Sequence, residues 1–477
     1  MPPAPSQPQY DVVVEEDVWV PLRDGVRLAA DVYRPARQGR PVEGRFPALL
    51  ERTPYGKRDP DRAERHGRWF ARRGYVVVLQ DVRGCYASEG ELYFLAQEPA
   101  DGYDTVEWVA AQPWCDGKVG TFGTSYMAWT QSALATQAPP HLAAMVPNMG
   151  GFNAHTSTVR HGGAFELRFM AWAFWHAACN TNRGLKEGKP WVDRALQHAD
   201  FRHWLTRLPL RRGQTPLALA PNYERWLFDL YTTAEYGEFW LQPGFNIEAH
   251  FAQHADVPCL ITGGWYDSYT RASCDYFVAY RQHKRSPARL LLGPWTHGAY
   301  TNELTYAGDV DFGPEAALDS FNELHLRWFD RWLKGVENGV EGEAPVRIFV
   351  MGGGTGRKNR DGRLDHGGHW RDEAEWPLRR ARPTPFYLHG DGTLRREPPR
   401  EGESCTTYRF DPQRPVPTIG GNFSSLDYVL PPPPRGDAAL LPPAFRRQPV
   451  TPAGGFDQRE GPLRYTRRNR NQQRRRK

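Results

Sequence analysis

Hydrophobic and polar positions follow a mixed strand and helix pattern in two stretches of the chain, residues 11–150 and 251–340. In both stretches, short runs of β-branched and apolar residues alternate with segments of helical spacing, such as Asp101–Gln112. The clearest strand candidates are Phe46–Leu50, Tyr75–Leu79, Val257–Gly263 and Arg289–Leu292. Strands that alternate with helices favour a mostly parallel sheet covered on both faces, so the pattern predicts an α/β fold.

Two further segments depart from this pattern. Over residues 151–250 the strand signal gives way to helical spacing rich in Trp and Phe, as in Val192–Leu208, which predicts a helical insertion. Beyond Pro345, short runs such as Val346–Met351 lie between Gly, Pro and Asp turns, a pattern typical of an all-β sandwich. We therefore expect an α/β domain that is interrupted by a helical insertion and followed by a β-domain over residues 345–460.

Basic residues are concentrated at the C-terminal end of the chain. The net charge is +6, but eight of the 61 Lys and Arg residues lie in residues 464–477, a stretch without any acid. Without these eight, the chain has slightly fewer basic residues than its 55 Asp and Glu. We therefore expect a basic disordered tail over residues 461–477 and no nucleic-acid partner.

The cysteines and the apolar runs narrow the class of protein further. The six cysteines have neither a CxxC pair nor metal-ligand spacing, so neither a disulfide framework nor a metal site is predicted. The N-terminus lacks the pattern of a signal peptide, and the apolar runs are too short to cross a bilayer. We expect a cytoplasmic protein that binds no membrane and needs no cofactor, and homo-oligomer formation stays open.

The segment around Ser125 carries the first chemical signal. A β-prone run ends at Gly123, and Met127–Gln137 favours a helix, so Ser125 falls on a strand-to-helix turn that would expose its hydroxyl. Such a turn directs the Tyr126 N–H and the helix N-terminus toward a developing oxyanion. The motif alone is weak, because Gly402-Glu-Ser has the same form without a strand or a helix, and an ordinary turn serine is the alternative.

Two later residues complete a candidate catalytic triad. In α/β hydrolases the chain order is Ser, then Asp or Glu, then His. Asp267 and His297 each follow a predicted buried strand, and the carboxyl ends of parallel strands meet at one edge of the sheet. We expect His297 to accept the Ser125 proton and Asp267 to orient the imidazole.

Several segments also have the sequence of characteristic family blocks. They are Leu22-Arg-Asp-Gly-Val-Arg-Leu, Arg52-Thr-Pro-Tyr-Gly-Lys, Asp81-Val-Arg-Gly-Cys, Gly123-Thr-Ser-Tyr-Met, Gly263-Gly-Trp-Tyr-Asp and Gly293-Pro-Trp-Thr-His. In this order, over about residues 11–460, the chain resembles the cocaine esterase and X-Pro dipeptidyl-peptidase family of serine hydrolases. The resemblance implies a helical cap over residues 151–250, a jelly-roll domain after the hydrolase domain, and a hydroxyl from Tyr55 that joins the Tyr126 N–H in the oxyanion hole.

The chain departs from the family pattern at two places. The α-amino-acid ester hydrolase branch follows its catalytic aspartate with further carboxylates, whereas Asp267 is followed by Ser268-Tyr-Thr-Arg, so an ammonium site is not expected. After Gly455-Phe-Asp the chain changes to an Arg-rich segment where the family's β-domain continues, which suggests a truncated or frame-shifted reading. Such a change would leave the β-domain incomplete.

The sequence leaves the substrate open. The aromatic residues Phe169, Trp172 and Trp175 in the insertion, and Trp265 beside the triad, are candidates for a substrate pocket, although helical spacing also fits a core. The leading expectation is hydrolysis of a small ester or amide through an acyl-serine. The alternatives are acyl transfer to an amine or alcohol, an X-Pro dipeptidyl peptidase, and a binding protein without catalysis, against which the triad and Tyr55 argue.

Overall fold

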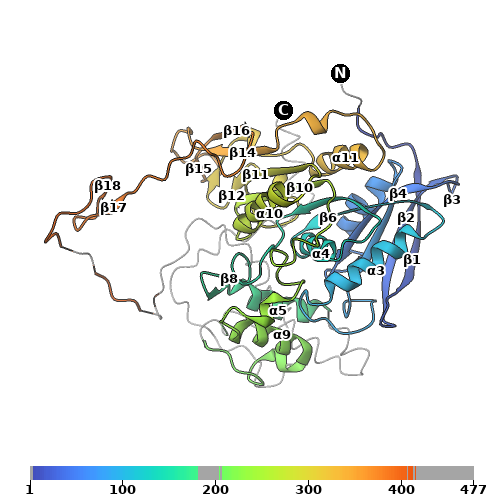
Figure 1. Cartoon of the computed structure of the whole chain (residues 1–477), viewed down its shortest axis with the longest axis horizontal. Helices are drawn as coiled ribbons and strands as arrows, with labels where there is room; N and C mark the ends of the chain where they lie inside the picture. Colours follow the sequence, from blue (N-terminus) through green and yellow to red (C-terminus); the bar gives the residue numbers. More distant parts are fainter. Residues whose placement is uncertain (1–3, 181–203, 205–206, 405–406, 412–413, 415–477) are drawn as a thin grey trace.

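A single large sheet forms the centre of the computed structural model, which describes residues 4–180, 204, 207–404, 407–411 and 414 (Figure 1). Within these residues the sheet has eleven strands in the order β1-β2-β5-β4-β6-β7-β10-β11-β14-β16, and β3 pairs with β2. Their bounds are β1 Asp11–Pro21, β2 Arg27–Arg37, β3 Arg40–Pro41, β4 Phe46–Thr53, β5 Val76–Asp81, β6 Cys115–Thr124, β7 Leu142–Asn148, β10 Cys259–Tyr266, β11 Ala288–Thr296, β14 Val346–Met351 and β16 Gly368–Glu373.

The middle of the sheet is parallel and its edges are antiparallel. The strands from β5 through β14 in the sheet order run parallel to their neighbours. Strand β2 pairs with β1 and β5 antiparallel, and β16 closes the other side as an antiparallel partner of β14. This mixed sheet of α/β-hydrolase type confirms the predicted fold class.

Helices cover both faces of the sheet because its central strands are apolar on both sides. On β4, Ala48 and Leu50 enter one cluster of buried residues, whereas Leu49 enters another. The first cluster includes side chains of α3, α4 and α10, and the second includes side chains of α2 and α11. The helices are α1 Pro60–Arg62, α2 Trp69–Ala71, α3 Glu98–Ala110, α4 Tyr126–Ala135, α5 Arg168–Asn180, α9 Pro221–Thr232, α10 Thr270–His283 and α11 Phe321–Trp332.

A helical segment is inserted between β7 and β10, which are neighbours in the sheet. Its helices α5 and α9 contact each other and form a group beside the sheet (Figure 1). Two short strands, β8 Arg160–His161 and β9 Ala164–Phe165, pair with each other at its start. The predicted helix over Val192–Leu208 lies almost entirely outside the described residues.

One predicted domain assignment changes at the second sheet edge. Val346–Met351 was expected to begin the β-domain, but as β14 it pairs with β11, and β16 extends the same sheet. The main sheet therefore continues past the expected boundary at residue 345. Among the described residues the rest of this region contributes only short strands, β15 Leu364–Asp365, β17 Tyr387–Leu388 and β18 Leu394–Arg395.

Candidate active site

The predicted site residues gather at the carboxyl edge of the sheet. The chain passes from β4 outward to β5 and then returns to β6 on the other side of β4, so the winding direction reverses between β4 and β6. In open α/β sheets, ligands bind in the crevice at this reversal. Tyr55 follows β4 and Ser125 follows β6, while Asp267 and His297 are the first residues after β10 and β11.

Ser125 occupies a sharp turn. Its φ of 66° and ψ of −119° lie in a region that side-chain-bearing residues rarely adopt, and α4 begins at the next residue. The turn requires a residue without a side chain two positions earlier, because a Cβ on Gly123 would lie 2.5 Å from the Cβ of Met127. Gly123 thus accommodates the large Met127. The Tyr126 N–H is at the first turn of α4, where backbone donors have no partner within the helix.

Ser125, His297 and Asp267 form a hydrogen-bonded row. The His297 Nε2 lies 2.7 Å from the Ser125 Oγ, and the His297 Nδ1 lies 2.9 Å from the Asp267 Oδ1. The same Oδ1 accepts the backbone N–H of Tyr269 at 3.1 Å, whereas the buried Oδ2 has no hydrogen-bond partner among the described residues. One carboxylate oxygen of Asp267 therefore receives both hydrogen bonds.

Tyr55 reaches the same place from β4. Its hydroxyl accepts a hydrogen bond from the Trp172 Nε1 at 3.1 Å. Burial raises the pKa of this hydroxyl, and hydrogen bonding to Trp172 and Ser125 opposes the rise. Because the indole N–H occupies an acceptor position of the Tyr55 oxygen, the Tyr55 proton can be directed elsewhere, toward a group bound at Ser125.

A histidine that the sequence analysis did not single out supports the Tyr55 loop. His176 lies one helical turn after Trp172 on α5, and the two rings stack 4.4 Å apart. Its Nε2 lies 2.6 Å from the Pro54 carbonyl oxygen, and its Nδ1 lies 2.7 Å from the Tyr223 hydroxyl. Burial lowers the pKa of His176 to about 4, so the neutral ring donates to Pro54 and accepts from Tyr223. The Trp172–His176 spacing is visible in the sequence, but its partner is not.

A small cavity opens beside the Ser125 hydroxyl. Its volume is about 20 Å³, space for about one water, so a substrate must displace the surrounding side chains. The lining residues are Tyr55, Phe94, Ser125, Tyr126, Trp129, Arg168, Phe169, Trp172, Tyr269 and His297. Two predicted pocket residues, Phe169 and Trp172, line the cavity. Trp175 contacts the Tyr55 ring instead, and Trp265 donates to the Phe349 carbonyl away from the cavity.

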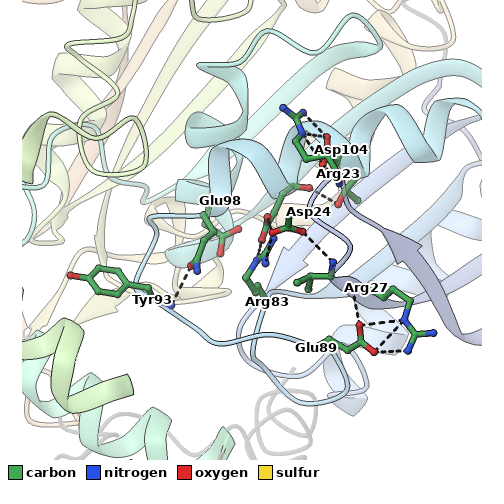
Figure 2. A network of polar contacts seen from close by, with 12 residues as sticks. Arg23, Asp24, Arg27, Arg83, Glu89, Tyr93, Glu98 and Asp104 are labelled. Atoms are coloured by element: carbon green, nitrogen blue, oxygen red, sulfur yellow. Dashed lines mark hydrogen bonds and ion pairs between the residues drawn. The ribbon is translucent and has the colours of Figure 1, made fainter. Parts of the chain in front are cut away.

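Acidic residues beside the site hold neighbouring loops, as expected. Arg83 makes a bidentate contact with Asp101, with N–O distances of 2.7 and 2.8 Å, and also pairs with Asp24 (Figure 2). Two further pairs in the same network, Arg23–Asp104 and Arg27–Glu89, join the turn after β1 and the start of β2 to α3 and to the loop after β5 (Figure 2). Among the described residues, no group of three or more His, Cys, Asp or Glu side chains is arranged to hold a metal ion.

Asp81 links the Tyr55 loop to the sheet. Its Oδ1 accepts the backbone N–H of Lys57 at 2.7 Å, and burial raises its pKa to about 6. Between about pH 4 and pH 6 the folded protein therefore holds a proton that the unfolded chain releases, so the free energy of unfolding falls as the pH rises through this window, by about 3 kcal/mol in all.

We expect Asp81→Asn, which stays neutral and keeps an acceptor oxygen, to lack this fall. Urea unfolding at pH 4 and pH 7 should show that the variant gains stability relative to the wild type at the higher pH. The exposed Asp309→Asn is the control, for which no such relative gain is expected. An Asp81→Asn effect of equal size at both pH values would contradict the prediction.

Comparisons with known proteins decide the family. Residues 24–299 match the model of the X-Pro dipeptidyl-peptidase (S15) family, which is more than half of the chain. The chain belongs to this family of serine hydrolases. Residues 338–438 match the family's C-terminal non-catalytic domain, so this hydrolase has the C-terminal β-domain that the sequence predicts.

Individual relatives agree with the family assignment. This S15-family chain is 34% identical to the cocaine esterase of Rhodococcus sp. (strain MB1 Bresler) over 427 residues, which are 86% of this chain and 70% of that protein. A solved α-amino acid ester hydrolase superposes with a TM-score of 0.64 at 21% identity and covers 89% of this chain and 69% of its own. An aminopeptidase from a marine sediment Thaumarchaeota archaeon gives a TM-score of 0.61 at 24% identity, with 81% and 63% covered. The two structural likenesses show the fold.

No helix in the described part of the chain is long and apolar enough to cross a membrane.

Proposed function

We propose that this hydrolase cleaves a small carboxylic ester or amide through an acyl-serine intermediate at Ser125. The observation that carries the proposal is the row of two hydrogen bonds, 2.7 and 2.9 Å long, that joins Ser125 through His297 to Asp267. This is the arrangement in which an imidazole removes the serine proton while a carboxylate holds the ring. A cytoplasmic location stays a prediction.

The reaction would proceed by double displacement. The Ser125 Oγ attacks the substrate carbonyl as His297 takes its proton, and the Tyr55 hydroxyl and the Tyr126 N–H stabilise the oxyanion. The intermediate collapses as His297 gives the proton to the leaving alcohol or amine, which leaves the acyl group on Ser125. Water, deprotonated by His297, then attacks the acyl-serine, and Ser125 leaves with the proton.

A fluorophosphonate probe tests the proposal directly. The probe should attach to Ser125, as identified by mass spectrometry of the labelled peptide, and the label should be absent from Ser125→Ala. Ser404, in an exposed turn of the same Gly-x-Ser form, is the internal control and should stay unlabelled. Folded protein that takes up no label would overturn the proposal.

Tyr55→Phe should lower kcat by roughly 10²- to 10³-fold, the usual effect of removing one oxyanion donor. KM should change little, because the hydroxyl stabilises charge that is absent from the ground state. Steady-state kinetics with a p-nitrophenyl ester measures both constants. Tyr10→Phe, at a tyrosine in the N-terminal strand region, is the matched control. A Tyr55→Phe variant with wild-type kcat would remove Tyr55 from the oxyanion hole.

The names of both family models favour a second candidate, cleavage of X-Pro dipeptides from a peptide N-terminus. Such a substrate carries an α-ammonium group near the scissile bond. The cationic Arg168 lines the cavity, and like charges repel there. We therefore expect higher kcat/KM for p-nitrophenyl esters than for Gly-Pro-p-nitroanilide, measured side by side. The reverse order would favour the peptidase.

A further inference from the structure

Arg168 is a cation in a cavity whose other lining side chains are mostly aromatic. It is the first residue of α5, and its side chain is only 6% exposed. Arginine is seldom buried so fully unless an anion accompanies it. A guanidinium held beside the reacting serine therefore asks for a reason beyond packing.

The Arg168 guanidinium lies close to the proposed catalytic groups. Its central carbon is 4.5 Å from the centre of the Tyr269 ring, over the ring face. The Tyr269 ring in turn meets the His297 imidazole edge to face, with 5.0 Å between centres. A single aromatic ring thus separates the cation from the imidazole. The Arg168 charge is also among the influences that oppose the burial-driven rise in the Tyr55 pKa.

Arg168 already has a counter-ion. The Glu166 Oε1 lies 3.4 Å from the Arg168 Nε. An arginine carries five N–H donors in a planar fork, so a pair made through Nε is compatible with a second oxygen anion on the guanidinium. Glu166 does not itself line the cavity, so the charge that faces a substrate there is positive.

A second donor belongs to the same wall. Trp129 lines the cavity and is almost fully buried, and its indole Nε1 donates to no acceptor among the described residues. A buried N–H without an acceptor is unfavourable by about 1–3 kcal/mol, and a ligand oxygen would relieve it. Arg168 and Trp129 therefore both match a ligand that accepts hydrogen bonds.

We propose that the substrate of this hydrolase is an ester or amide that carries a carboxylate, and that Arg168 binds this carboxylate. The inference rests on the proposed function, because it places the scissile carbonyl at Ser125. The carboxylate stands on either the acyl group or the leaving group, a short aliphatic or aromatic spacer away from the carbonyl. Phe169 and Trp172 pack against that spacer after they move apart to admit it.

Three p-nitrophenyl and carboxyphenyl esters separate the two sources of the carboxylate. The neutral reference is p-nitrophenyl pentanoate, mono-p-nitrophenyl glutarate places the carboxylate on the acyl group, and 4-carboxyphenyl pentanoate places it on the leaving group, with its methyl ester as the neutral partner. The uncatalysed rate, which is higher for the glutarate, is subtracted. We expect kcat/KM of one anionic ester to exceed that of its neutral partner by about 10- to 100-fold, as a charge-assisted hydrogen bond allows.

The variants assign that preference to one residue. In Arg168→Gln the ratio of anionic to neutral kcat/KM should fall to about one, and Arg168→Lys should retain part of it. Arg281→Gln, at an exposed arginine in the last turn of α10, removes the same charge elsewhere and should leave the ratio unchanged. A wild-type ratio at or below one for both anionic esters, or a ratio that survives Arg168→Gln, would overturn the proposal.

The same samples distinguish this result from failure of the proposed function. Fluorophosphonate labelling and turnover of the neutral ester are measured in each preparation. A folded wild-type protein that shows neither contradicts the proposed function itself. Labelling and neutral turnover without a charge preference contradict only the carboxylate site.

Discussion

Ser125→Ala is expected to lower kcat for a p-nitrophenyl ester by roughly 10⁶-fold, the loss found when a triad nucleophile is removed. The expectation follows from the 2.7 Å contact between the Ser125 Oγ and the His297 Nε2, which couples attack to proton removal. The remaining rate would come from the oxyanion donors and from substrate binding, which need no nucleophile. Burst kinetics with active-site titration would keep trace wild-type contamination out of the measurement.

A double variant sharpens this prediction. If Ser125 and His297 act as one unit, Ser125→Ala/His297→Ala should be no slower than either single variant, because each alone already removes the nucleophilic route. Ser404→Ala, in the exposed Gly402-Glu-Ser turn, is the matched serine control and should have wild-type kinetics. Losses that multiply in the double variant would mean that the two side chains contribute separately and that the row is not a relay.

Asp267→Ala should lower kcat by roughly 10⁴-fold, with a smaller change in KM. The carboxylate holds the imidazole through its Nδ1 and offsets the positive charge that develops on His297 as the serine proton moves. Without it, the ring loses both its orientation and this charge compensation. Steady-state kinetics across pH would show the loss at every pH where His297 is neutral in the free enzyme.

The position of the two hydrogen bonds on Asp267 distinguishes alanine from asparagine. Both the Tyr269 N–H and the His297 Nδ1 use Oδ1, so an asparagine oxygen at that place can accept both bonds and keep the imidazole tautomer. Its amide nitrogen would then take the place of the unpartnered Oδ2. We expect Asp267→Asn to retain at least ten times the activity of Asp267→Ala. Equal losses would show that the negative charge, and not the ring orientation, is what matters.

Local sequence was sufficient for the elements that carry the chemistry. The run that ends at Gly123 and the helix that follows Ser125 were predicted because a strand, a tight turn and a helix leave a signature within about twenty residues. Asp267 and His297 were predicted by the same reasoning, since each follows a buried strand of a parallel sheet. The structure brings all three side chains within hydrogen-bonding distance.

Contacts between distant segments could not be predicted in this way. The aromatic residues of α5 have the spacing of an ordinary buried face, so the sequence does not distinguish Trp172, which donates to Tyr55, from Trp175, which does not line the cavity. Arg168 would pass for a surface arginine at a helix start. Its burial and its place beside Tyr269 arise only when the inserted helix packs against the loop after β10.

The sequence by itself therefore determined the α/β class, the order of the strands along the chain, and the serine, aspartate and histidine, because hydrophobic runs and turns are local properties. Tertiary structure alone decided which sheet Val346–Met351 joins, how α5 supports the Tyr55 loop, and that a buried cation faces the substrate. Strand pairing and helix docking are set by partners far away in the chain, and a strand or helix pattern does not name its partner.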